Sequence, residues 1–209
     1  MPLAEDGYDI TGVDLSPAML ALARVAVGRA GVTERAMLIE DDIRTLAAIG
    51  DRRFGLAFSA INSFLHLTTQ GEQLAALGAA FAHLDPGGIL VLDAFPPHPD
   101  ILNEYDGRLI HAGTYRDPRT GERIDKLSTT VLDSAEQRMD TVFFYDRLRA
   151  DGRVERTAAP FTFRYVGSYE LQLLLARAGF ADITFYGSYD LDPFTAASDR
   201  MIAVAVRPE

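Results

Sequence analysis

Short apolar segments alternate with helix-forming segments through the first half of the chain, and this alternation constrains the fold more than any other feature. The apolar segments are residues 8–14, 36–40, 54–60 and 89–95. They are mostly apolar throughout, which is typical of strands covered on both faces. Ser16 is a good N-cap and Pro17 suits the first position of a helix that continues to about residue 30. A second helix, over residues 70–84, is expected to stop at a turn over residues 85–88 (Asp-Pro-Gly-Gly). The alternation predicts an α/β fold with a parallel sheet between helices.

A different pattern covers residues 108–165. Polar and apolar residues alternate there over several extended segments, which turn signals at 119–121 and 151–152 separate. This pattern predicts an antiparallel β-meander inserted into the α/β domain. One helix and two strands are expected to follow, at residues 170–178, 182–186 and 201–207. We therefore predict a cofactor-binding α/β part, a β insertion and a C-terminal return to the α/β sheet, at residues 1–107, 108–166 and 167–209.

The composition narrows the choice of partners. The 209 residues carry 20 basic and 30 acidic side chains, a formal net charge of −10. This charge argues against nucleic acid or an anionic membrane as the main partner and favours a small molecule. The chain has no cysteine and its four histidines lack paired spacing, so no metal site is expected. No apolar run could span a bilayer and no signal peptide is visible, so we expect a cytoplasmic protein.

Two of the predicted strands end in carboxylates. Ligands of open α/β sheets bind beyond the carboxyl ends of the strands, so these side chains are candidates for a site. Asp14 precedes a helix N-terminus, where a carboxylate can accept both vicinal hydroxyls of a ribose in an adenosine-containing cofactor. Asp42 follows the next strand and could accept a hydrogen bond from an adenine amine. The simpler alternatives are that Asp14 only assists the helix cap and that Asp42 is a solvated turn acid.

Several segments, taken in order, resemble class I S-adenosylmethionine-dependent methyltransferases. They are GYDITGVDLSPAML (7–20), DDIRTL (41–46), NSFLHL (62–67), LDPGGILVLD (84–93) and YELQLLLARAGF (169–180). The likeness covers nearly the whole chain and is greatest to small-molecule enzymes with a β insertion, including amino-sugar N-methyltransferases. It implies a Rossmann-like sheet, mostly parallel with an antiparallel last strand. It also implies S-adenosylmethionine as cofactor and methyl transfer to a nitrogen or oxygen of a small molecule.

The resemblance also implies roles for individual residues. Those expected at the cofactor are Asp14 at the ribose, Leu15 and Met19 beside the adenine, Asp42 and Ile43 at its edge, and Ser59 and Ala60 beside the methionine. Met19 has a simpler interpretation as a core residue, because a methionine on an apolar helix face usually packs inside. His66 would orient or deprotonate the acceptor, since imidazole titrates near neutral pH; alternatively it packs among its apolar neighbours.

Further residues are expected at the substrate. They are Asn62 and, on a β insertion that would form a lid, Tyr145, Arg164 and Tyr165. The alternative for the last three is packing across strands, which is common for aromatic and arginine side chains on a meander.

One part of the family pattern is absent. Complete members begin with a strand and a glycine-rich E/D-x-G-x-G-x-G loop, whereas none of the 17 glycines here forms a G-x-G. In the family's strand order, 3-2-1-4-5-7-6, that first strand is central. Either the sequence is a piece of a longer protein, the interpretation favoured here, or the strands ending at Asp14 and Ser59 pair directly. Unpaired strands at the centre of the sheet could encourage self-association, for example as a homodimer.

Two other functions remain open. A folded but non-catalytic domain could bind adenosine compounds or act as an interaction module, as the absent loop suggests. A nicotinamide-dependent dehydrogenase also carries a carboxylate after its second strand. The Asp-Pro-Gly-Gly sequence of residues 85–88 and the acid at Asp42 fit methyltransferases better.

Overall fold

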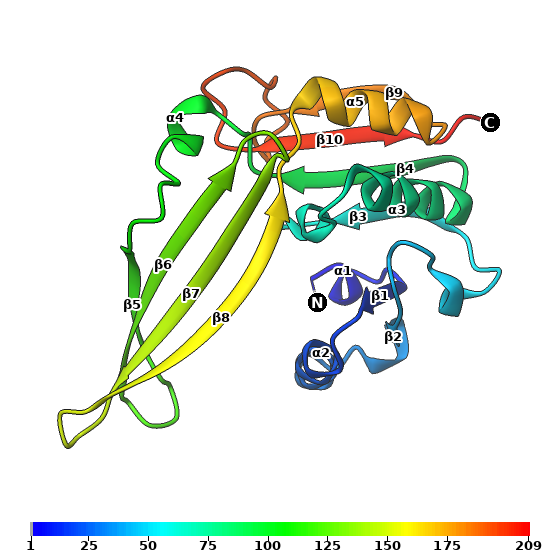
Figure 1. Ribbon diagram of the computed structural model, residues 1–209. Coiled ribbons are helices and arrows are strands. Elements are labelled where there is room, and N and C mark those ends of the chain that lie inside the picture. The colour runs from blue at the N-terminus through cyan, green and yellow to red at the C-terminus, as the bar shows by residue number, and fades with distance from the viewer. Residues whose placement is uncertain (1) are drawn as a thin grey trace.

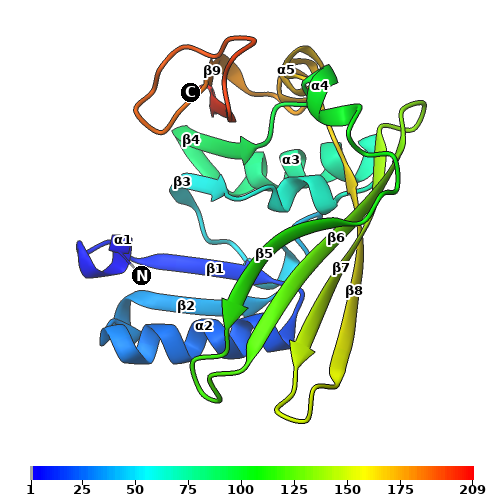
Figure 2. The same ribbon diagram turned by 90° about the vertical axis from the view of Figure 1, so that its left-hand side faces the viewer.

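The computed structural model describes residues 2–209, which form an α/β part and a separate antiparallel sheet (Figures 1 and 2). The helices are α1 (Pro2–Glu5), α2 (Pro17–Ala30), α3 (Gln70–His83), α4 (Pro99–Leu102) and α5 (Ser168–Arg177), with short 3-10 helices at Thr33–Arg35, Ala47–Ile49 and Ser63–His66. The strands are β1 (Ile10–Asp14), β2 (Ala36–Glu40), β3 (Phe54–Ser59), β4 (Leu84–Ala94), β5 (Ile110–Arg116), β6 (Arg123–Asp133), β7 (Arg138–Leu148), β8 (Val154–Arg164), β9 (Ala181–Tyr186) and β10 (Met201–Val206). No helix within residues 2–209 is long and apolar enough to cross a bilayer.

The first sheet pairs β1 with β2 in parallel, and α2 connects them. The Ser16 hydroxyl accepts a hydrogen bond from the Met19 N–H at 3.3 Å, and Pro17 occupies the first turn of α2. Gly31 follows the helix with φ 69°, a left-handed conformation that glycine adopts without the steric cost of a Cβ. The predicted start and end of this helix are therefore confirmed.

The second sheet has the strand order β3-β4-β10-β9. β3 is parallel to β4, whereas β10 is antiparallel to both of its neighbours. α3 begins with a capping box, in which Thr69 and Glu72 each accept a hydrogen bond from the other's backbone N–H at 3.1 Å. The core lies between this sheet and the helices α3 and α5, and its most buried members include Leu65, Leu77, Leu84, Leu171 and Leu175. The predicted α/β fold with an antiparallel last strand is confirmed.

The prediction of a turn at residues 85–88 is wrong. These residues belong to β4, which begins directly after α3. The Gly87 N–H donates to the Arg207 carbonyl at 2.9 Å, and the Arg207 N–H donates to the Gly88 carbonyl at 2.8 Å. The pairing of β3 with β4 shifts register over the same stretch, as it does at a β-bulge. Proline and glycine therefore mark an irregular section of a strand here rather than a turn.

The third sheet is the predicted antiparallel meander, with the order β5-β6-β7-β8. Its strands are joined in succession, and β6, β7 and β8 each have 11 residues, so the sheet is long and narrow. Figures 1 and 2 show that it projects from the α/β part and stays in contact with it mainly near the carboxyl end of β4. This arrangement places one face of the meander beside the ends of the α/β strands.

The two α/β sheets lie next to each other with β1 and β3 as their facing edges (Figure 2). Within residues 2–209, β1 pairs only with β2, and β3 pairs only with β4. The strands that end at Asp14 and Ser59 therefore do not pair directly, and that alternative from the sequence analysis is wrong.

Candidate functional site

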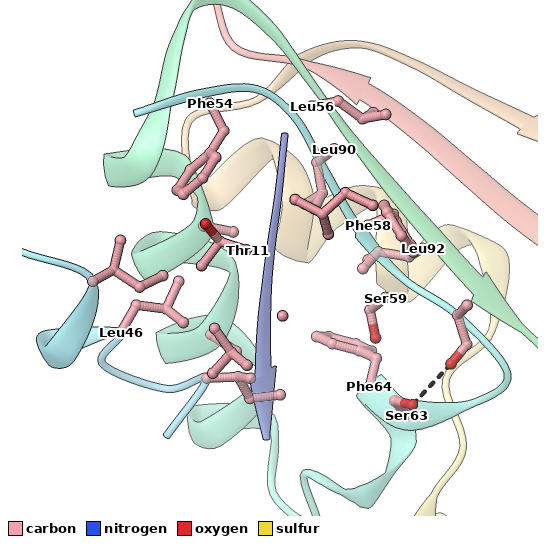
Figure 3. Close-up of a pocket in the computed structure, with 18 of the residues that line it drawn as sticks. Thr11, Leu46, Phe54, Leu56, Phe58, Ser59, Ser63, Phe64, Leu90 and Leu92 are labelled. Carbon is pink, nitrogen blue, oxygen red and sulfur yellow. Dashed lines mark hydrogen bonds between the residues drawn. The ribbon is translucent and has the colours of Figure 1, made fainter. Parts of the chain in front are cut away.

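The carboxyl ends of β1, β3 and β4 gather at one side of the α/β part, where ligands bind in folds of this class. Asp14 is the last residue of β1, and Ser59 is the last residue of β3. A cavity of about 870 Å³ lies between these two strands (Figure 3). Of the residues expected at the cofactor, Ile43, Ser59 and Ala60 line this cavity. Asp14 lies at the carboxyl end of β1, and Leu15, Met19 and Asp42 lie beyond the ends of β1 and β2.

Asp14 is half-buried, and one of its carboxylate oxygens accepts a hydrogen bond from the Ser16 N–H at 2.7 Å. This bond is the helix-capping role that the sequence offered as the simpler alternative. The second oxygen has no hydrogen-bond donor among residues 2–209, so Asp14 can cap α2 and still accept a ligand hydroxyl. Leu15 and Met19 expose 61% and 53% of their surface. Met19 is therefore not a core residue, and both side chains offer apolar surface next to Asp14.

Asp42 is already paired within the chain. Its carboxylate accepts hydrogen bonds from the Arg44 guanidinium at 2.6–3.0 Å and from the Arg44 backbone N–H at 2.9 Å. These hydrogen bonds lower the pKa of Asp42, and those from the Arg44 side chain have the largest effect. Arg44 also donates to Glu72 at 2.7 Å, which ties this turn to the start of α3. Asp42 could accept a ligand amine only in addition to Arg44, through the remaining lone pairs of its carboxylate.

His66 ends the 3-10 helix that follows β3 and faces the third sheet. The centroid of its ring lies 4.4 Å from that of Phe163 and 5.8 Å from that of Phe161, both on β8. Phe143 on β7 extends this surface, 4.8 Å from Phe161. We call Phe143, Phe161 and Phe163 the aromatic wall. The sequence analysis missed it, although alternate phenylalanines in a predicted strand indicate a shared face.

The aromatic wall changes the chemistry of His66. Burial against it disfavours the charged imidazolium and lowers the pKa of His66 from its ordinary value of 6.5. Neither ring nitrogen hydrogen-bonds to another of the described residues, and part of the side chain remains exposed. At neutral pH His66 is therefore a neutral imidazole that can accept a proton from a group placed beside it.

Asp93, near the end of β4, organises the turn that leads to His66, and the sequence analysis gave it no role. It is 5% exposed and accepts hydrogen bonds from the Ile61 N–H at 3.1 Å and the Tyr189 hydroxyl at 2.8 Å. Arg200 pairs with the same carboxylate at 3.1 Å. The available signal was its position at the end of a strongly apolar strand, the same signal that identified Asp14.

Asn62 helps to fix the same turn. Its side-chain oxygen accepts a hydrogen bond from the Phe95 N–H at 2.7 Å, and its own N–H donates to the Asp93 carbonyl at 3.1 Å. Ile61 and Asn62 have φ values of 53° and 63°, a strained conformation for a β-branched residue. Such strain is often held at functional sites. Asn62, expected at the substrate, thus holds the backbone between Ser59 and His66.

Arg164 is engaged within the fold. The residue is 7% exposed, and its side chain donates hydrogen bonds to Gln73 at 2.9 Å, Gln137 at 2.6 Å and Glu170 at 2.8 Å. Gln73 belongs to α3 and Glu170 to α5, so Arg164 joins the end of β8 to both core helices. The structure does not bring this guanidinium into the cavity.

The two tyrosines expected on the insertion lie in different places. Tyr145 is on β7, two residues beyond Phe143 and therefore on the same face of the sheet. The Lys126 ammonium lies 3.6 Å from the centroid of the Phe143 ring and 6.0 Å from that of Tyr145. Tyr165 lies after β8, half-buried, and its N–H donates to the Gln137 carbonyl at 3.0 Å. Tyr145 alone of the two is on the surface that continues the aromatic wall.

Comparison with known proteins gives a consistent picture. Residues 1–88 match the family described as "Methyltransferase domain". Carboxy-S-adenosyl-L-methionine synthase of Chromohalobacter salexigens is 35% identical over 98 residues, which are 47% of this chain and only 34% of that protein. Cypemycin N-terminal methyltransferase of a Streptomyces species is 28% identical over 206 residues, which are 98% of this chain and 77% of that protein. The chain thus spans about a third of the first relative and about three quarters of the second.

Solved structures share the fold. The CcbJ methyltransferase from Streptomyces caelestis has a TM-score of 0.78 at 22% identity and covers 98% of this chain and 81% of its own. The sugar N-methyltransferase KedS8 from a Streptoalloteichus species has a TM-score of 0.72 at 23% identity and covers 95% of this chain and 71% of its own. These likenesses cover both the α/β part and the meander, so the two belong to one shared architecture.

Proposed function

We propose that this chain is a class I S-adenosylmethionine-dependent methyltransferase, which transfers a methyl group from that cofactor to a nitrogen or oxygen of a small molecule. The observation that carries the proposal is the placement of Asp14 and His66. Asp14 ends β1 with a carboxylate oxygen directed to no partner in the described chain, and His66 follows β3 as a neutral base beside the aromatic wall. A ribose-binding group and a proton acceptor thus lie at neighbouring strand ends.

The residues present fit the adenosine end of the cofactor. Asp14 would accept the ribose hydroxyls, and the exposed apolar side chains of Leu15 and Met19 would pack against the adenine. Asp42 would accept the adenine amine beside its bond with Arg44, and the backbone of Ile43 would bind the adenine edge. Ser59 and Ala60 would lie beside the methionine end. When bound, the cofactor supplies a methyl group on a positively charged sulfur, which needs no further activation.

His66 would act on the acceptor rather than on the cofactor. With the methyl donor already activated, the protein's main task is to align the acceptor atom, an effect worth up to roughly 7–11 kcal/mol. A protonated amine or a hydroxyl must also lose its proton, and the neutral His66 imidazole can accept it. The aromatic wall and Tyr145 would pack against the body of the acceptor and exclude water.

The names of two similar proteins support nitrogen, rather than oxygen, as the acceptor atom. Two of the similar proteins carry this chemistry in their names, a sugar N-methyltransferase and an N-terminal methyltransferase. An amine that is largely protonated at neutral pH must lose a proton before it attacks, and the lowered pKa keeps the His66 imidazole unprotonated and available to accept that proton. We therefore place primary and secondary amines of small molecules, amino sugars among them, first among the acceptors to test.

The cofactor part of the proposal is tested by calorimetric titration with S-adenosylhomocysteine. We expect Asp14→Ala to weaken binding by roughly 10- to 100-fold, because hydrogen bonds to a charged group contribute about 1.5–3 kcal/mol. Asp51→Ala, at an exposed turn outside the site, is the matched control and should bind as the unaltered chain does. Equal affinity of the Asp14→Ala and Asp51→Ala variants would remove Asp14 from the site.

The catalytic part is tested by turnover of S-adenosylmethionine with a panel of amino sugars. We expect His66→Gln to lower kcat by roughly 100-fold or more, the usual range for loss of a general base. In the unaltered chain the rate should fall as the pH drops through a pKa below 6.5, where His66 takes up a proton. The variant should lack this pH dependence; an unchanged profile would assign it to another group.

A further inference from the structure

The face of the meander that bears the aromatic wall also bears the chain's single lysine, Lys126. Lys126 lies on β6 opposite Tyr145 of β7, and its ammonium is 3.6 Å from the centroid of the Phe143 ring. The Phe143 ring packs on Phe161, and the centroid of the Phe161 ring lies 5.8 Å from that of His66. Two rings of the aromatic wall therefore separate the Lys126 ammonium from the proposed base.

A comparison of the two faces of the meander shows which partner Lys126 lacks. On the opposite face Arg156 stacks on Phe144, 4.8 Å from the ring centroid, and also pairs with the Asp146 carboxylate at 2.7 Å. Lys126 stacks on Phe143 in the same way, but its ammonium has no carboxylate partner and no hydrogen-bond acceptor within residues 2–209. An aromatic ring attracts a cation without taking up its N–H groups. The three N–H donors of Lys126 therefore remain available to a ligand.

Two hydroxyl groups beside Lys126 are available as well. Ser128, two residues further along β6, and Tyr145, opposite Lys126, lie on the same face of the sheet as the lysine. Neither hydroxyl hydrogen-bonds to another residue in the described part of the chain, and all three residues are half-buried. Closer to the core on this face, by contrast, the Thr130 and Thr141 hydroxyls pair with each other at 3.0 Å. An ammonium and two hydroxyls thus form a group of donors without acceptors.

The charge available at this group of donors indicates which acceptor it suits. Arg147, the next cation along β7 on this face, is already held by Asp117 at 2.8 Å and Glu122 at 3.0 Å. The single free cation, Lys126, matches the one negative charge of a carboxylate better than the nearly two charges of a phosphate at neutral pH. The chain as a whole has a net charge of −10, so an anion is attracted only close to a cation without an acidic partner.

We propose that Lys126, together with the Ser128 and Tyr145 hydroxyls, binds a carboxylate of the methyl acceptor. This inference rests on the proposed methyl transfer and specifies its substrate class, a small molecule with an amine at one end, beside His66, and a carboxylate at the other, across the aromatic wall. Amino sugar acids are molecules of this kind. An uncharged acceptor leaves the half-buried ammonium without an ionic partner, so the site discriminates against it. Lys126 is thus a specificity-determining residue and takes no part in proton transfer.

NMR of the single lysine tests this binding without any need for turnover. A chain that carries isotope-labelled lysine gives one side-chain signal, which belongs to Lys126. In the presence of S-adenosylhomocysteine, the signal is followed during titration with glucosaminuronic acid or with glucosamine, which has a hydroxymethyl group in place of the carboxylate. We expect a saturable shift with glucosaminuronic acid and none with glucosamine. The same response to both sugars, or to neither, would overturn the proposal, and tighter binding of glucosamine phosphate would assign the donors to a phosphate.

Turnover of the same two sugars tests the effect on specificity. Lys126→Met keeps an apolar side chain on the Phe143 ring but removes the charge. We expect it to raise the KM for glucosaminuronic acid roughly 10- to 100-fold, with kcat and the KM for glucosamine little changed. Lys126→Arg keeps the charge and should recover part of the loss, and Arg156→Met, which removes the stacked cation of the opposite face, is the matched control and should change neither KM.

The outcomes separate this inference from the proposed function. Equal rises in KM for both sugars in Lys126→Met would give Lys126 a structural role and overturn the inference, while methyl transfer to amines would stand. If the unaltered chain methylates neither sugar, the result counts against the proposed function, and the NMR titration still decides whether Lys126 binds a carboxylate.

Discussion

The antiparallel meander and the α/β part differ in how their strands obtain partners. β7 pairs with β6 and β8 in an unbroken register of 11 residue pairs on each side. In the α/β part, by contrast, the parallel pairs β1-β2 and β3-β4 face each other across a cavity. Hairpins join neighbouring antiparallel strands, whereas parallel neighbours depend on crossovers from distant sequence. The strands of the meander therefore find their partners within 55 residues, from Ile110 to Arg164, whereas the two α/β sheets do not pair with each other within residues 2–209.

The two regions are also stabilised by different interactions. The α/β part has the apolar core, in which Leu65, Leu171 and Leu175 are fully buried. The far end of the meander has a network of ion pairs at its surface, half-buried around Arg147 and more exposed around Arg149. Exposed ion pairs contribute little to stability and are screened by salt. We therefore expect substitutions to have large effects where the meander meets the core and small effects at its far end.

The largest effect is expected at the junction, for Arg164→Met. This change removes the charge that pairs with Glu170 and the donor to Gln73, which is fully buried. Breaking a buried ion pair from one side costs about 3–5 kcal/mol. Gln70 and Gln137 still donate to Glu170 in the variant, so we expect a loss of about 3 kcal/mol, measured by urea unfolding at neutral pH.

Arg153→Met is the matched control for this prediction. Arg153 is in the hairpin at the far end of the meander, and its side chain is 87% exposed. Its replacement should change the free energy of unfolding by no more than about 0.5 kcal/mol. If the two variants lose similar stability, the junction is not what couples the meander to the core.

A smaller effect is expected on the pKa of His66 in Phe161→Ala. Removing one ring of the aromatic wall lets water reach the imidazole, so the pKa of His66 should rise toward its ordinary value of 6.5. NMR titration of the ring protons measures this shift, and His66→Gln identifies the resonance. Phe144→Ala is the control, because Phe144 lies on the opposite face of the sheet and packs on Arg156. A lowered or unchanged value in Phe161→Ala would show that another group sets this pKa.

The same shift affects stability with a defined sign. Because the pKa of His66 is lower in the folded chain than 6.5, the unfolded chain binds the proton more readily. The stability that comes from the lowered pKa of His66 is therefore present above about pH 6.5. It is lost as the pH falls through the pKa that His66 has in the folded chain. The loss should be smaller in Phe161→Ala.

The sequence predicted those parts of the fold that local patterns determine. Ser16, Pro17 and Gly31 bound α2 as expected, because a cap acts on the neighbouring residues. The hairpins of the meander follow from alternation and turn residues for the same reason. The prediction failed at residues 85–88, where the backbone partner is Arg207, far along the chain. A local turn signal cannot report a pairing with a distant strand.

In the candidate site too, features set by neighbouring residues could be predicted from the sequence, whereas contacts between distant residues could not. The position of Asp14 at a strand end could be read from the sequence, and the structure leaves one of its oxygens available. The engagement of Arg164 could not be read, because Gln73 is 91 residues away in the chain. Arg44, which pairs with Asp42, is only two residues away and could have been noticed. The role of His66 remains a prediction, since its environment depends on strands about 100 residues later.

The smallest effect at neutral pH is expected at the far end of the meander, for Arg147→Met. Hydrogen bonds from the Arg147 side chain, with further ones from the Arg119 and Thr120 N–H groups, lower the pKa of Asp117 to about 2. In Arg147→Met this pKa should rise toward 3.8 but stay below it, because the backbone donors remain. Titration of the carboxyl carbon by NMR measures the change, and Arg156→Met, which frees Asp146 on the same sheet, should leave Asp117 unaffected.

Because the pKa of Asp117 is lowered on folding, its contribution to stability is present above about pH 3.8 and is lost as the pH falls toward 2. Arg147→Met should therefore lower the Tm slightly at neutral pH, and the difference between the two chains should shrink as the pH falls from about 3.8 toward 2, where the unaltered chain loses the same contribution. A large loss of Tm at neutral pH would mean that the exposed ion pairs help to hold the whole molecule together. The meander would then depend on its charges as much as the α/β part depends on its core.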